Sequence, residues 1–282
     1  MGDWNSADNA KQVSGEAMDS KIFTESNRRA WNEATRYHQD AKQEKFFREF
    51  KKPGYSTLDR VVTTEIKRIG LAGKHVGQIC CNDGRETLSL INLGAKTAVG
   101  FDISDDAINE AKRLSQSSGI DCEFVRSDVY EIPADYDATF DFIYISIGVF
   151  GWMPDLEKFF LVVSRLLKPG GDLLIYEQHP FADVFDQENR SEPLKIVNPY
   201  FNNKPLADDS GMDYWGGKQY KGEVSYWFFH TLGEIIGGMI KSGFEIRWFQ
   251  EYDRDISSCW EHIEKTGKRL PLSYILLGKK HQ

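Results

Sequence analysis

The chain has 282 residues, with 35 Lys and Arg against 43 Asp and Glu, and is 40% hydrophobic and 13% aromatic. This length and apolar content suffice for one large domain with additions, or for two modest domains. Gly, Pro and aromatic residues along the whole length exclude an overall disordered chain or coiled coil. The net charge of −8 argues against a protein whose main task is to hold a nucleic acid backbone.

Signals for export, membrane insertion and metal binding are missing from the sequence. The first twenty residues are polar, which predicts no secretory signal and a cytoplasmic location. No apolar run reaches the roughly 18 residues that cross a bilayer, so no membrane association is expected. The four cysteines form no C-x-x-C pair, which favours reduced thiols and predicts no metal site. We expect a monomer or a homodimer that binds no nucleic acid.

The N-terminal quarter of the chain is expected to be a flexible segment followed by a helical cap. Residues 1–24 are polar, and residues 25–70 carry the helical patterns of the cap. Apolar residues fall at helical spacing over residues 25–52. A second helix is predicted to begin at Ser56, because Ser-x-x-Asp resembles a capping box, and to end at Gly70.

Over residues 71–282, short apolar runs alternate with segments of helical periodicity. Strict alternation predicts βαβ units with right-handed crossovers, and hence a doubly wound α/β domain with a mostly parallel sheet. The last two strands follow one another with no helix between them. The predicted strands are Val76–Cys80, Thr97–Phe101, Cys122–Val125, Phe140–Ile145, Leu173–Tyr176, Phe244–Phe249 and Ser273–Gly278.

The alternation stops at His179. Residues 179–222 contain turn signals and many aromatic side chains but no clear period. A loop of that length in a compact domain is usually a functional lid or an insertion with its own structure. Alternation resumes with a helix that Thr231 opens, because Thr231 and Glu234 match a capping box.

Small or acidic side chains follow each of the first four predicted strands. In a doubly wound fold, ligands bind at the carboxyl ends of the strands. Asp102 comes about twenty residues after the turn that follows the first strand, which is the spacing of a ribose-binding carboxylate. Ser104 can cap the next helix in its place. Asp128 adds an acceptor suited to an adenine amino group, so the spacing indicates an adenosine-containing ligand.

Four motifs in order resemble those of class I S-adenosylmethionine-dependent methyltransferases that act on small molecules. They are Val76–Glu86, Val99–Asp102, Ser127–Val129 and Leu166–Gly171. The resemblance implies a Rossmann-like methyltransferase fold with a seven-stranded, mostly parallel sheet whose last strand is reversed. It also implies S-adenosylmethionine as the cofactor and S-adenosylhomocysteine as the product.

The resemblance assigns roles to the matching residues. Asp102 would contact the ribose, while Asp128 and the backbone of Val129 would contact the adenine. The turn after the first strand would face the methionine part, and Ser146 would border the methyl group. The residues expected around the cofactor are Tyr37, Cys80, Asn82, Gly84, Asp102, Ile103, Asp128, Val129 and Ser146.

The first motif departs from the family pattern at three positions. The family usually has an acid where this chain has Gln78, and glycines where it has Cys80 and Asn82. Asn tolerates positive φ and Cys is small, so a close approach of the backbone to a ligand stays feasible. The missing acid weakens the electrostatic hold on the methionine ammonium. Only Gly84 remains of the glycine fingerprint of NAD enzymes, which argues against a dehydrogenase.

Methyl transfer to a hydroxyl or a protonated amine requires a base, and two histidines are candidates. His179 is the first, because it follows the fifth predicted strand, and His230 at a helix start is the second. The alternative for each is a histidine that satisfies a loop carbonyl or a cap.

The sequence therefore predicts a methyltransferase that acts on a small-molecule acceptor by in-line displacement. The aromatic side chains of residues 179–229 suggest a cover for a small organic acceptor. A non-catalytic protein that binds S-adenosylmethionine or S-adenosylhomocysteine is the alternative, because of the altered turn.

Overall fold

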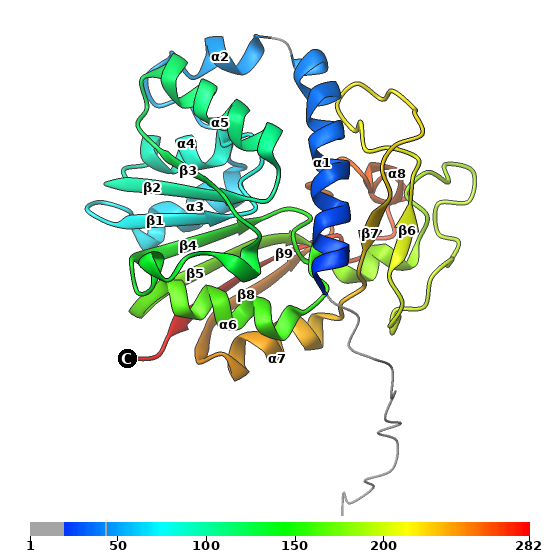
Figure 1. Cartoon of the computed structure of the whole chain (residues 1–282). Helices are drawn as coiled ribbons and strands as arrows, with labels where there is room; N and C mark the ends of the chain where they lie inside the picture. Colours follow the sequence, from blue (N-terminus) through cyan, green and yellow to red (C-terminus); the bar gives the residue numbers. More distant parts are fainter. Residues whose placement is uncertain (1–19, 43) are drawn as a thin grey trace, which may run out of the picture.

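A seven-stranded sheet with the order β3-β2-β1-β4-β5-β9-β8 runs through the molecule (Figure 1). The computed structural model describes residues 20–42 and 44–282. Strands β1 to β5 pair in parallel, and β9 runs antiparallel to both of its neighbours. The strands are β1 (His75–Ile79), β2 (Thr97–Asp102), β3 (Glu123–Arg126), β4 (Phe140–Ser146), β5 (Leu167–Gln178), β8 (Phe244–Tyr252) and β9 (Ser273–Lys280). The predicted doubly wound, seven-stranded methyltransferase fold is confirmed.

Helices cover both faces of the sheet, because side chains of each strand alternate between two cores. On one face, Phe142 of β4 packs with α3 (Arg60–Ile69) and α4 (Arg85–Asn92). On the other, Ile143 packs with α6 (Leu156–Leu166) and α7 (Leu232–Lys241). Further helical segments include α5 (Asp105–Ser118), α8 (Glu261–Glu264), η1 (Val129–Glu131), η2 (Ala134–Tyr136) and η3 (Phe150–Trp152). None of the helices described is long and apolar enough to cross a membrane.

The N-terminal cap differs from its predicted bounds. Residues 1–19 of the predicted flexible segment lie outside the described residues, whereas residues 20–24, which were predicted to belong to that segment, are part of helix α1 (Ser20–Lys42). Phe23 accounts for the helical order of these residues, because its ring is buried against Tyr226 at a centroid distance of 4.9 Å. The predicted single helix is also interrupted, and a short helix α2 (Lys45–Glu49) follows.

The start of α3 also corrects a prediction. Asp59, not Ser56, is the N-cap residue, and its carboxylate accepts the N–H of Val61 at 2.6 Å. The predicted end at Gly70 is confirmed. The capping box of α7 is confirmed as well, with both reciprocal hydrogen bonds between Thr231 and Glu234.

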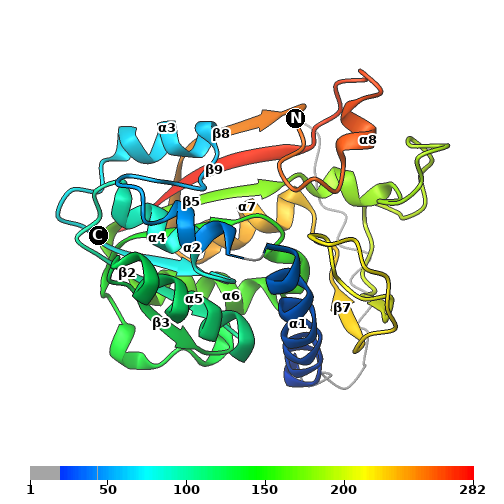
Figure 2. The same cartoon turned by 90° about the horizontal axis from the view of Figure 1, so that it is seen from above.

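The insertion after β5 forms a hairpin beside α1. It begins with η4 (Pro180–Val184) and continues to β6 (Leu206–Asp208) and β7 (Ser225–Trp227), which pair antiparallel. The hairpin therefore extends the insertion beyond residue 222. Asn27 of α1 exchanges two hydrogen bonds with the backbone of Tyr226, at 3.1 and 2.7 Å. Figure 2 shows α1, β7 and α8 gathered at the end of the sheet toward which the β5 arrow points.

Two adjacent glycines of α7 give a matched test of this packing. A Cβ at Gly238 would lie 2.6 Å from the Phe160 ring, whereas a Cβ at Gly237 would meet no atom within 4 Å. We expect Gly237→Ala to raise the free energy of unfolding by about 1 kcal/mol through helix propensity. The free energy of unfolding of Gly238→Ala should be lower than that of Gly237→Ala by about 1–3 kcal/mol, because the added methyl group overpacks the core. Urea denaturation of both variants checks this, and equal stabilities would contradict the packing.

Candidate functional site

Asp102 joins the end of β2 to the turn that follows β1. Its Oδ2 accepts the backbone N–H of Asn82 at 2.8 Å, and its Oδ1 accepts that of Ser104 at 2.9 Å. Ser104 itself caps α5 by accepting the N–H of Ala107 at 3.1 Å, as predicted. Since a carboxylate offers about four acceptor positions, Asp102 keeps acceptor capacity for a ligand. Burial raises the pKa of Asp102 to about 6.

The turn between β1 and α4 has the backbone conformation that glycines would favour. Cys80, Asn82 and Gly84 all have positive φ, at 55°, 50° and 75°. A left-handed conformation costs a non-glycine residue roughly 1–2 kcal/mol, and such strain collects at functional sites. The two substitutions for the family's glycines therefore leave the shape of the turn intact.

The end of β3 lies directly beside the end of β2. The N–H of Ser127 donates to the carbonyl of Asp102 at 2.8 Å. Asp128 follows and is buried, and its Oδ1 accepts the N–H of Tyr130 at 3.0 Å, so it also caps η1. Val129 is the first residue of η1 and Ile103 the residue after β2, so the predicted nucleoside residues lie on adjacent strand ends.

Carboxylates converge on the thiol of Cys80. Burial raises the pKa of this thiol well above its usual range, and the charges of Asp102, Asp128 and Glu177 raise it further. The ends of β2, β3 and β5 thus place three acids close enough to this thiol to disfavour its ionised form. The same negative charges would favour a cationic ligand such as a sulfonium.

At the end of β4, Ser146 lies in a small polar cluster. Its Oγ donates a hydrogen bond to the carboxylate of Glu86 and lies 3.4 Å from Nε2 of Gln78. Ser146 is buried, as is Gln78. Sequence reasoning placed Ser146 in the site but missed Glu86, although Glu86 ends the first motif.

Basic and aromatic side chains close over the turn from α1 and the insertion. Lys42 and Arg85 bind the carboxylate of Asp83 at 2.6 and 2.8 Å. Although burial opposes it, these two cations hold the pKa of Asp83 well below its usual range. The Trp215 ring lies over both cations, at 4.8 and 4.9 Å. These four residues form a cover over the turn.

Tyr37, which was predicted to lie near the cofactor, contacts the insertion. Its ring packs on Tyr220 at 4.3 Å, and the Lys218 ammonium lies 4.5 Å from it. Both partners belong to the insertion, so Tyr37 contributes to the junction between α1 and the insertion. The helix turns the side chain of Tyr37 toward the hairpin, and helical spacing alone does not reveal that direction.

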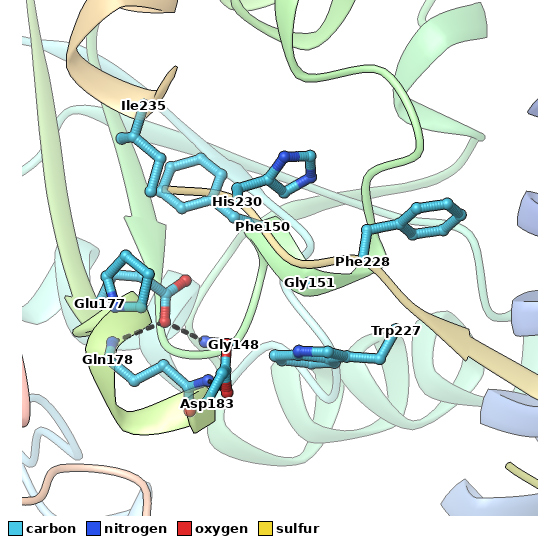
Figure 3. Close-up of a pocket in the computed structure, with 11 residues that line it drawn as sticks. Gly148, Phe150, Gly151, Glu177, Gln178, Asp183, Trp227, Phe228, His230 and Ile235 are labelled. Carbon is cyan, nitrogen blue, oxygen red and sulfur yellow. Dashed lines mark hydrogen bonds between the residues drawn. The ribbon is translucent and has the colours of Figure 1, made fainter. Parts of the chain in front are cut away.

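A small cavity of about 20 Å³ lies beyond the ends of β4 and β5, which is room for about one water molecule (Figure 3). Figure 3 shows Glu177 and Asp183 on one side and His230 and Phe228 on the other, with the Trp227 indole extending toward Asp183. Burial raises the pKa of Glu177 and of Asp183 to about 7 each. Glu177 accepts the N–H groups of Gly148, Val149 and Gln178, so it holds the loop after β4.

His230 lines both this cavity and a larger groove. Its Nε2 donates to the carbonyl of Met153 at 2.8 Å, which leaves the lone pair on Nδ1. Burial lowers its pKa, so the ring is neutral at pH 7. His230 and Phe228 also line a groove of about 920 Å³ between α1, α6 and α7.

His179, the first candidate base, has structural partners on both ring nitrogens. Nδ1 accepts the N–H of Phe181 at 3.0 Å and caps η4, while Nε2 donates to Glu251 of β8 at 3.0 Å. The lone pair is therefore used, and His179 does not line the cavity. The alternative reading of this histidine as a cap describes the geometry better.

The parallel order with one reversed strand, and the acids on adjacent strand ends, define a doubly wound nucleotide-binding fold of the methyltransferase type. Residues 76–171 match the model of the methyltransferase domain family. The chain is 30% identical over 117 residues to a sterol 4-C-methyltransferase of Caenorhabditis elegans, covering 41% of this chain and 34% of that protein. It is 31% identical over 128 residues to a ubiquinone biosynthesis O-methyltransferase of Escherichia coli, covering 45% and 50%.

Among solved structures, the geranyl diphosphate C-methyltransferase of Streptomyces coelicolor A3(2) is similar, with a TM-score of 0.55 and 12% identity over 79% of each chain. That crystal contains S-adenosyl-L-homocysteine. The match over residues 76–171, together with the methyltransferases among the relatives and the solved structures, confirms the predicted resemblance to class I S-adenosylmethionine-dependent methyltransferases, whose cofactor is S-adenosylmethionine. The chain spans only about a third to a half of the length of the two curated relatives.

Proposed function

We propose that the protein transfers a methyl group from S-adenosylmethionine to a small-molecule acceptor by in-line displacement. The observation that carries this proposal is the bond between Asp102 and the N–H of Asn82, within a turn that has three left-handed residues. This bond holds a ribose-type carboxylate against a backbone open to close approach. When bound, the cofactor supplies an activated methyl group and its own leaving group.

The residues of the chain bind, orient and exclude water. Asp102 and Asp128 hold the nucleoside from adjacent strand ends. The cover formed by Lys42, Asp83, Arg85 and Trp215 shields the turn between β1 and α4 from water. Such positioning of two reactants lowers the barrier of a bimolecular step by up to about 7–11 kcal/mol. Ser146 borders the transferred methyl group from the end of β4.

His230 is the group that we propose takes the acceptor proton. Its neutral ring and the lone pair on Nδ1 support this role, as does its place between the cavity and the groove. Asp183 lies across the cavity and orients the acceptor by accepting a hydrogen bond from it. The reacting group then lies between two proton acceptors.

The groove supports an organic acceptor of appreciable size, because about 920 Å³ accommodates a drug-sized molecule. The names of the relatives point the same way, since they refer to a sterol, to ubiquinone biosynthesis and to geranyl diphosphate. A cytoplasmic location and a monomeric or dimeric state belong to the proposal, and fractionation and light scattering test them.

Calorimetry with S-adenosylmethionine and S-adenosylhomocysteine tests the proposal first. We expect both to bind at micromolar concentration or tighter, and radiolabelled methyl to pass into a metabolite extract. Binding of neither ligand would contradict the proposal. Binding without transfer into any extract would favour the non-catalytic binding protein instead.

A further inference from the structure

The position where the family has an acid holds Gln78, yet a carboxylate lies within hydrogen-bond distance of this side chain. Nε2 of Gln78 donates to Oε2 of Glu86 at 3.0 Å, and Oγ of Ser146 donates to the same oxygen. Glu86 is in the first turn of α4, eight residues after Gln78. A negative charge therefore reaches the end of β1 from the neighbouring helix.

Thr87 fixes the orientation of the Gln78 amide. The Thr87 hydroxyl donates to Oε1 of Gln78 at 2.6 Å, so the amide NH₂ faces Glu86 and Ser146. A glutamate at position 78 would bring two carboxylates to about 3 Å, and one of them would have to be protonated. Glutamine is the residue that allows Glu86 to be charged in this place.

The carboxylate of Glu86 is only partly satisfied. Both donors bind Oε2, and Oε1 accepts no hydrogen bond from any residue that the structure describes. Burial raises the pKa of Glu86. Glu86 is half-buried and its Oε1 still reaches solvent, so a ligand that covers this oxygen has to supply a cation or hydrogen-bond donors. An ammonium group in the cleft would supply both the charge and the donors.

We infer that Glu86 has taken over the role of the missing motif acid and binds the ammonium of the cofactor's methionine part. This rests on the proposed function, because it requires an S-adenosylmethionine site. The turn after β1 faces the same part of the ligand, and Ser146 and Gln78 hold the Glu86 carboxylate in place.

Binding of two ligands to wild type and Glu86→Gln tests this inference. S-Adenosylhomocysteine carries the ammonium, whereas 5′-methylthioadenosine has the nucleoside and thioether without the amino acid part. We expect Glu86→Gln to weaken S-adenosylhomocysteine binding about 10- to 100-fold, as for the loss of one charge-assisted hydrogen bond. The affinity for 5′-methylthioadenosine should stay within about twofold of wild type.

Two further variants make the result specific. The exchange variant Gln78→Glu with Glu86→Gln returns the acid to β1, and we expect it to recover most of the lost affinity. It also carries the test if Glu86→Gln alone does not fold. Glu65→Gln, at a carboxylate of α3 paired with Arg68 at 2.7 Å, is the matched control and should change neither affinity.

The outcomes separate this inference from the proposed function. If wild type bound neither ligand, the cofactor site and the inference would both be wrong. If wild type bound both and Glu86→Gln left the ratio of the two affinities unchanged, the inference alone would fail. An equal loss for both ligands would assign Glu86 a structural role in the turn.

Discussion

Asn in place of Asp102 is expected to weaken S-adenosylhomocysteine binding about 100-fold or more. A hydrogen bond that a charged carboxylate accepts contributes roughly 1.5–3 kcal/mol, and a ribose offers two hydroxyl donors. Asn keeps one acceptor oxygen but presents an NH₂ group toward donors. Calorimetry measures the loss. Asp106→Asn, four residues along the chain and paired with Arg36 at 3.0 Å, should bind like wild type.

The pH dependence of binding tests the ribose assignment of Asp102 independently. Burial raises the pKa of Asp102 to about 6, so its carboxylate becomes protonated as the pH falls below 6. Only the charged form accepts from both hydroxyls, so the affinity should fall between pH 7 and pH 5. Asp102→Asn should lack this decline. An undiminished affinity at pH 5 in wild type, or in the variant at pH 7, would refute the ribose assignment.

The second large effect is expected from His230→Ala, which should lower turnover about 10²- to 10⁴-fold, the usual contribution of a general base. S-Adenosylhomocysteine affinity should stay within about twofold, because His230 lines the acceptor side of the site. The matched control is His179→Ala, which loses a cap and the bond to Glu251 but no lining of the cavity. Its turnover should change far less.

The pH profile of turnover distinguishes His230 from Asp183. Burial lowers the pKa of His230 from its usual 6.5, so a histidine base stays active until the pH falls below that value. The pKa of Asp183 is raised to about 7, so a carboxylate base would lose activity from pH 7 downward. A midpoint near pH 7 that disappears in Asp183→Asn would transfer the base role to Asp183.

The features that the sequence predicted correctly are local or periodic. The capping box of Thr231 and Glu234 lies within one turn of helix, and the order of the motifs follows directly from the alternation of strands and helices. The three-residue strands β6 and β7 have too few residues for a pattern. The helical structure of residues 20–24 depends on a contact between Phe23 and the distant Tyr226.

The same distinction applies to the site. Asp102 was predicted because the ends of strands and the spacing between them can be recognised in the sequence. Glu86 was missed, although the absence of an acid at Gln78 was a signal that another acid had to be sought nearby. The environments of Asp183 and His179 are set by Trp227 and Glu251, which belong to other elements of the fold. No local sequence pattern predicts such pairs.

The junction of α1 with the hairpin has a consequence for the catalytic cycle. Ser26 and Asn27 bind the backbone of Val224 and Tyr226, and Lys42 at the other end of the helix binds Asp83. The helix therefore contacts both the hairpin and the turn. If the protein is the methyltransferase proposed above and these contacts have to open before S-adenosylhomocysteine is released, release would limit the steady-state rate, and a rapid first turnover would precede a slower linear phase.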